Sequence, residues 1–122
     1  MRLIYPAVLA VAVTCAACGG GGDSPSTSTS GLATSAVSQT CAAVGAILSD
    51  GPDPDADPIG YAEAQVRPLR GVETSDTALA DAVAALADAY QRQFQDGDGP
   101  PERAAVASAE QRMNVLCPGA AP

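Results

Sequence analysis

Four segments of the chain carry apolar residues at the three- and four-residue spacings of one helix face. The first covers about residues 33–48, and the second covers residues 58–68, where Pro68 is expected to end the helix. The third follows the capping residues Thr74-Ser75-Asp76, and the fourth begins at Pro100. The stripes are Val37, Cys41, Val44 and Leu48; Ile59, Ala62, Val66 and Leu69; Leu79, Val83, Leu86, Tyr90 and Phe94; and Val106, Ala109, Met113, Leu116 and Cys117. Because no segment alternates with a period of two over a useful length, we predict an all-α domain over residues 32–118.

The N-terminal segment has the order of residues typical of an export signal. Arg2 precedes an apolar run, Leu3 to Val13, and the small residues Ala16 and Ala17 follow. The run is about 11 residues long, which is too short for the ~20 residues of a membrane-spanning helix. The Gly-, Ser- and Thr-rich residues after it have the composition of a flexible linker. We therefore predict a signal peptide over residues 1–17 and a disordered tether over residues 18–31.

Ala16-Ala17-Cys18 resembles the lipobox of bacterial lipoproteins, which reads Leu, two small residues and then the Cys that is lipidated. Cys15 stands where the family usually has Leu. The resemblance covers the signal region and implies that Cys18 carries a diacylglyceryl thioether, with or without an amide-linked third chain. Such an anchor holds a protein at the extracytoplasmic face of the cell membrane. Two alternatives are an ordinary signal peptide that releases the chain and a C-x-x-C redox pair formed by Cys15 and Cys18.

The two remaining cysteines, Cys41 and Cys117, fall on the apolar faces of the first and last predicted helices. In an oxidising compartment this pair is expected to form a disulfide. The bridge would contribute on the order of 4 kcal/mol by restricting the unfolded chain. A small, alanine-rich core needs such support. The expected architecture is therefore a small disulfide-stapled four-helix bundle after the disordered tether, with residues 119–122 as a disordered tail.

The charge of the chain argues against two classes of function. It has 14 acidic and 6 basic residues, no histidine, and a net charge of −8. Such a domain repels nucleic acid. Without histidine, acid–base catalysis would depend on carboxylates, and no pair of acids lies on an apolar face. Serine and threonine are concentrated in the tether, where no base can activate them. We expect a protein that is not an enzyme and that carries no cofactor.

Alternating aspartates occupy the segment between the first two predicted helices, as they do in calcium-binding loops. When the segment is aligned with an EF-hand from Asp53, the required glycine is Pro58 and the final glutamate is Ala64. The short run Asp96-Gly97-Asp98-Gly99 fails in a similar way. We interpret these acids as turn and capping residues. Asp53, Asp55 and Asp57 remain weak calcium candidates.

Tyr61, Tyr90 and Phe94 are the aromatic residues after the signal. Tyr90 and Phe94 are one helical turn apart and are candidates to line the mouth of a site for an apolar ligand, and Tyr90 is a candidate ligand of a haem iron. Cysteines near both ends of the domain are loosely similar to those of small exported helical haem carriers. The alternative interpretation is that the rings fill a core short of bulky side chains.

Together these features favour a membrane-anchored lipoprotein whose helical domain binds an envelope protein as an accessory module. Such a module needs an exposed apolar surface. The alternative is a carrier of a small apolar ligand such as haem or lipid, which needs an internal cavity. A structural spacer is a third possibility. The pattern identifies no particular partner and leaves the oligomeric state open.

Overall fold

The computed structural model describes residues 29–122, which form four α-helices and no strands. They are α1 (Thr29–Leu48), α2 (Pro58–Arg70), α3 (Thr77–Asp96) and α4 (Pro100–Leu116). The all-α, disulfide-stapled bundle predicted from the sequence is therefore confirmed. The predicted signal peptide, Cys18 and the tether up to residue 28 lie outside the described residues.

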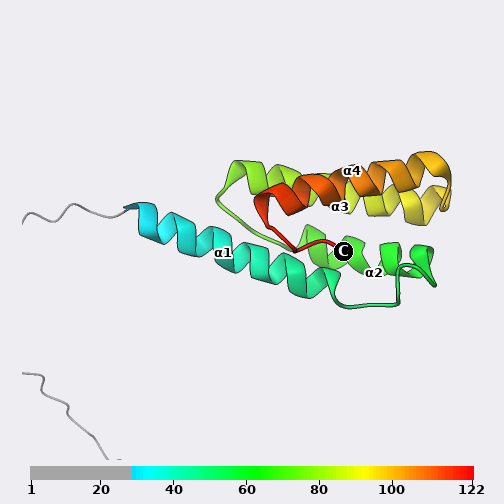
Figure 1. Cartoon of the computed structure of the whole chain (residues 1–122), viewed down its shortest axis with the longest axis horizontal. Coiled ribbons are helices and arrows are strands. Elements are labelled where there is room, and N and C mark those ends of the chain that lie inside the picture. The colour runs from blue at the N-terminus through cyan, green and yellow to red at the C-terminus, as the bar shows by residue number, and fades with distance from the viewer. Residues whose placement is uncertain (1–28) are drawn as a thin grey trace, which may run out of the picture.

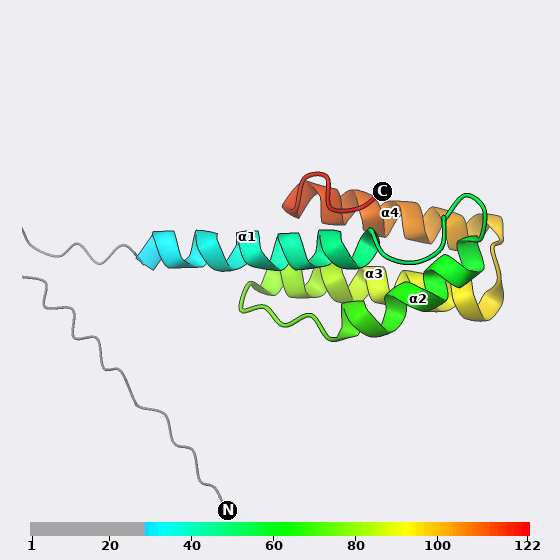
Figure 2. The ribbon, with the colours of Figure 1, turned by 90° about the horizontal axis from the view of Figure 1, so that it is seen from below.

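Helix α3 is the centre of the bundle, and it packs against α2 on one side and α4 on the other. Helix α1 packs mainly against α2, and its N-terminal half extends beyond the ends of the other helices (Figures 1 and 2). The loop between α1 and α2 and the turn between α3 and α4 lie at the opposite end of the molecule. None of the described helices has the length and apolarity of a membrane span.

The core is built around α3, which buries eight residues along its length. Over residues 33–48 of α1, only Val44 and Leu48 belong to the fully buried core, while Val37 and Cys41 are partly buried. Much of the remaining core is alanine, which allows the helices to approach closely. The buried residues of α2 to α4 and the C-terminal segment are Tyr61, Ala62, Gln65, Leu69, Leu79, Ala82, Val83, Leu86, Ala87, Ala89, Tyr90, Gln93, Val106, Ala109, Met113, Cys117 and Ala121.

The last turns of the predicted stripes differ from the observed buried faces. On α3 the stripe continues from Tyr90 by three residues to Gln93, which is 5% exposed, and Phe94 is 41% exposed. The steps of four, three and four residues that precede Tyr90 require a step of three to stay on one face of a helix. On α4, Leu116 is 36% exposed, while the neighbouring Cys117 faces the core.

Helix α2 turns a slightly different face to the core from the one predicted. Tyr61 and Gln65 are buried, whereas Ile59 and Val66 are only partly buried. The two faces are adjacent on the helix surface. The fixed packing of α2 against both α1 and α3 selects between them, and spacing along one helix carries no information about that choice.

Side chains and prolines set the helix boundaries. Asp57 Oδ1 accepts a hydrogen bond from the Gly60 amide at 2.9 Å and caps α2. Asp76 Oδ1 caps α3 in the same way, through the Leu79 amide at 2.8 Å. Both caps match the sequence prediction, and α4 begins at Pro100 as expected.

Three boundaries were predicted wrongly. Residues 119–122 are not a disordered tail, because Ala121 is buried and both its amide and its carbonyl hydrogen-bond to the Asn114 side chain. Helix α1 begins at Thr29, so the last residues assigned to the tether are helical. Helix α2 continues past Pro68 to Arg70. Proline lacks an amide hydrogen but keeps its carbonyl, and the Pro68 carbonyl accepts a hydrogen bond from the Gly71 amide at 3.0 Å. Near a helix end, a tight final turn of this kind tolerates the proline.

The disulfide Cys41–Cys117 ties α1 to the residue that follows α4. The two Cα atoms are 5.3 Å apart and the cysteines are separated by 76 positions in the sequence. Cys117 is buried and Cys41 is half-buried. The bridge therefore fastens the least embedded helix to the end of the bundle, as the sequence predicted.

Candidate functional site

A cleft of about 350 Å³ opens at the end of the molecule where the α1–α2 loop lies close to the turn between α3 and α4. Its polar lining residues come from the α1–α2 loop, the turn between α3 and α4, and the helices α2, α3 and α4: Asp55, Tyr61, Tyr90, Gln93, Asp98, Arg103 and Glu110. Pro54, Pro58, Val106 and Ala107 supply its apolar lining. We call this feature the Glu110 cleft, because Glu110 accepts the hydrogen bond that joins α3 to α4 in it.

The central contact of the cleft joins α3 to α4. The Tyr90 hydroxyl donates a hydrogen bond to Glu110 Oε1 at 2.7 Å. The rings of Tyr61 and Tyr90 pack edge to face, with their centroids 5.6 Å apart. The Tyr61 hydroxyl donates to the Leu48 carbonyl at 2.7 Å, which connects the cleft to the end of α1. Both tyrosines are thereby fixed in position.

Burial changes the acidity of all three groups. Burial raises the pKa of Glu110, and the Tyr90 hydrogen bond opposes this by stabilising the carboxylate. Burial, together with the Glu110 charge, raises the pKa of Tyr90 far above its ordinary value. Burial also raises the pKa of Tyr61. Around neutral pH the tyrosines are therefore neutral donors, and Glu110 is a carboxylate that is poorly compensated for its partial burial.

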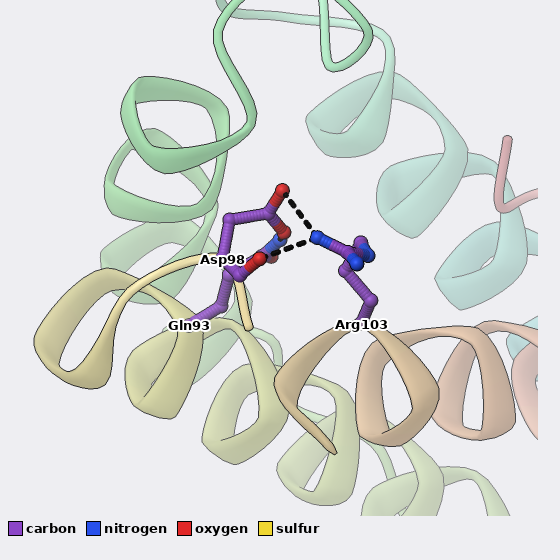
Figure 3. A network of polar contacts seen from close by, with 3 residues as sticks. All are labelled: Gln93, Asp98 and Arg103. Atoms are coloured by element: carbon purple, nitrogen blue, oxygen red, sulfur yellow. Dashed lines mark hydrogen bonds and ion pairs between the residues drawn. The ribbon is translucent and has the colours of Figure 1, made fainter. Parts of the chain in front are cut away.

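A second polar network lies beside this contact and is shown in Figure 3. Asp98 stands between Gln93 and Arg103: Gln93 Nε2 donates to Asp98 Oδ1 at 2.7 Å, and the Arg103 guanidinium lies 3.2 Å from Asp98 Oδ2. Arg103 also donates to the backbone carbonyl of Asp98. This network fixes the turn between α3 and α4. It also pairs the single basic residue of the cleft lining with an acid.

The two predicted ligand-binding residues are separated by the fold. Tyr90 lines the cleft, but the residue is only 1% exposed and its hydroxyl donates a hydrogen bond to Glu110. Phe94 does not belong to the cleft lining and faces solvent. This arrangement does not favour a shared mouth for an apolar ligand, or Tyr90 as an iron ligand. Tyr90 is part of the core, as the alternative interpretation expects, whereas Phe94 is exposed and does not fill the core as that interpretation expects.

The weak calcium candidates make local contacts within the loop. Asp53 Oδ1 accepts a hydrogen bond from the Asp55 amide at 2.8 Å, and Asp57 caps α2. Within residues 29–122, no three acidic or cysteine side chains come together as a metal-binding group. The contacts observed are those of turn and capping residues.

Helix α1 borders two further hollows, which we call the α1 grooves. One, of about 580 Å³, lies between α1 and the α2–α3 connection, and Ala36, Ala43, Ile47 and Val72 supply apolar parts of its lining. The other, of about 500 Å³, lies along the disulfide, where Val37, Ala42, Leu116 and Ala120 contribute. The whole of α1 contains no charged residue. An uncharged helix is thus only half embedded in a protein with a net charge of −8.

Sequence reasoning did not single out Glu110, although a signal was present. Val106, Glu110 and Met113 follow one another at steps of four and three residues, the spacing of a buried helix face. Val106 and Met113 are indeed buried. An acid at such a position is unusual, because burial disfavours its charge. The Tyr90 partner could not be identified from the sequence, since it belongs to another helix.

No protein-family model, curated protein or solved structure matches this chain.

Proposed function

We propose that this chain is an extracytoplasmic lipoprotein, anchored in the cell membrane through Cys18, whose helical domain binds a partner protein of the cell envelope. In this proposal α1 is the docking helix, and the partner contributes an apolar helix or strand to the α1 grooves. The domain has an accessory, non-catalytic role.

The observation that carries the proposal is the chemistry of α1. Solvated helices normally carry charged residues on their exposed face. Helix α1 has none over its 20 residues, and residues 33–36 in its N-terminal half are exposed. A helix of this composition resembles one side of a protein–protein contact, where charged residues are depleted.

The α1 grooves add shape to this surface. They lie along both sides of α1, and Ala36, Ala43 and Ile47 leave room for larger side chains of a partner. The carrier hypothesis has no comparable support, because both grooves and the Glu110 cleft open to solvent, while large side chains such as Tyr90 and Leu86 fill the core. Cys18 precedes α1 by a short stretch of sequence, so an anchored domain would present α1 near the membrane.

Site-specific photocrosslinking in membranes of the native host tests this proposal. A benzoylphenylalanine at Gln39, in the first α1 groove, should give one dominant protein adduct, and the same probe at Glu63, on the exposed face of α2, should not. Adding Ala43→Glu should abolish the Gln39 adduct by placing a charge in the groove. The matched variant Ala84→Glu, on the exposed face of α3, should leave it intact.

The outcomes separate the parts of the proposal. Docking through α1 is contradicted if the probe at Gln39 gives no adduct, or if the yield of that adduct is unchanged by Ala43→Glu. Independently, Cys18→Ala should move the protein from the membrane fraction to the soluble fraction. Retention of this variant in the membrane would contradict anchoring through Cys18.

A further inference from the structure

We propose that the Glu110 cleft binds a primary alkylammonium group, supplied by a free amine or by a lysine side chain. This site is distinct from the α1 grooves, and the proposal stands whether or not α1 docks a partner. It rests on the geometry of one carboxylate, on the charges around it and on the apolar lining of the cleft.

Glu110 is a held carboxylate without a cation. Its Oε1 accepts the hydrogen bond from Tyr90, and the ion pairs of residues 29–122 are Arg70–Asp88 and Arg103–Asp98. No basic side chain in this part of the chain therefore compensates Glu110. A cation bound beside a partly buried carboxylate stabilises its charge in place of the water that burial has removed. The Tyr90 hydroxyl fixes the carboxylate in position, so the Glu110 side chain loses little conformational entropy when the ligand binds.

The charges that face Glu110 in the cleft are mainly negative. Asp55 comes from the α1–α2 loop, Asp98 from the turn before α4, and Arg103 from α4 itself. Because Asp98 pairs with Arg103, the remaining lining charges are the two carboxylates of Asp55 and Glu110. The other ionisable groups of the lining, Tyr61 and Tyr90, are neutral. The field in the cleft therefore favours a cation and opposes an anion.

The lining also indicates the shape of the cation. Pro54, Pro58, Val106 and Ala107 offer apolar contacts to an alkyl chain. The volume of about 350 Å³ lies at the small end of the range for ligand sites. One carboxylate oxygen is already held by Tyr90, which suits the compact charge of an ammonium better than a guanidinium, because guanidinium groups pair with both oxygens at once. Alkyl amines are protonated at neutral pH, because their pKa values are about 10.

An NMR titration of the oxidised full chain with n-butylammonium chloride tests the proposal. Amide signals of residues 103–110 should shift in a saturable way, whereas n-butanol and butyrate should leave them nearly unchanged. Glu110→Gln keeps an acceptor for Tyr90 and removes only the charge, so the fold should persist and binding should weaken at least ~10-fold. The matched control Glu63→Gln removes one charge from an exposed site outside the cleft, and its affinity should stay within about twofold.

A second readout follows from linkage. The carbon-13 signal of the Glu110 carboxyl should titrate at a lower pH when butylammonium is bound, because the cation stabilises the carboxylate. The proposal is overturned if butanol shifts the same amides as strongly as butylammonium, or if Glu110→Gln binds as well as the native chain.

A parallel titration with N-acetyl-lysine-N′-methylamide distinguishes the two sources of the ammonium group. Tighter binding than butylammonium supports the proposal with a lysine side chain as ligand, and weaker binding supports it with a free amine. Neither result depends on crosslinking at α1, so failure here and failure of the proposed docking function can be distinguished.

Discussion

Removing the Cys41–Cys117 disulfide should destabilise the domain strongly and should release α1 before the other helices. The bridge spans a sequence separation of 76. In the chain-entropy description a loop of this size contributes about 4.5 kcal/mol at room temperature. For a domain of fewer than about 100 residues, this corresponds to a fall in Tm of about 20 °C or more.

The effect should be uneven because α1 is weakly embedded. Its fully buried side chains are Val44 and Leu48, and burying each contributes ~1.5–3 kcal/mol. The disulfide is therefore comparable to the combined burial of these two side chains, and partly buried residues such as Val37 and Ile47 add less. The Tyr61 hydrogen bond to the Leu48 carbonyl adds only about 1 kcal/mol.

The assay compares the oxidised chain with the double variant Cys41→Ala/Cys117→Ala, with Cys15 and Cys18 replaced by serine in both. Thermal unfolding followed by circular dichroism gives the two Tm values. Hydrogen exchange then compares amide protection in α1 with protection in α3. A fall in Tm below about 5 °C would refute the loop-entropy reasoning. Equal loss of protection in α1 and α3 would refute the conclusion that α1 depends mainly on the bridge.

Three further perturbations test the caps, the cleft and the core. Asp57→Ala should lower the free energy of unfolding by about 1 kcal/mol, because the α2 cap is lost. Asp81→Ala, on the exposed face of α3, should change the urea midpoint little, and equal effects of the two variants would contradict the capping role. Burial raises the pKa of Glu110 in the folded chain, so ionisation of this group lowers the stability of the fold. The stability of Glu110→Gln should therefore increase relative to the native chain as the pH rises from about 3.5 to 7. A difference in urea midpoints that stays constant with pH would rule this out. Leu86→Ala should cost ~2–5 kcal/mol and Phe94→Ala less than about 1 kcal/mol, because only the first is buried, and the reverse order in denaturant unfolding would contradict the observed core face of α3.

Some features of the candidate site could be predicted from the local sequence pattern. The capping roles of Asp57 and Asp76 follow from their positions just before helical segments, and the structure has both contacts. The helix spacing also placed Tyr90 on the core face of α3, where it is buried. The same spacing failed to separate Gln93 from Phe94, because a step of three and a step of four residues both remain close to one face.

The pairing of Glu110 with Tyr90 required the tertiary structure. The two residues belong to different helices, and their contact depends on the rotation of α3 and α4 about their own axes. The pairing of Asp98 with Gln93 and Arg103 likewise depends on the path of the turn between the two helices (Figure 3). Sequence spacing within one helix constrains neither geometry.

The sequence by itself determined that the described part of the chain forms four helices, where most of them begin, and that Cys41 and Cys117 face the core. These are local properties, since apolar spacing, capping and proline act within a few residues of each position. Only the tertiary structure decided that the uncharged α1 is half embedded beside two grooves, and that a carboxylate without a cation lines a cleft at the other end. Those features depend on how much surface each helix shares with its neighbours, which packing among distant segments determines.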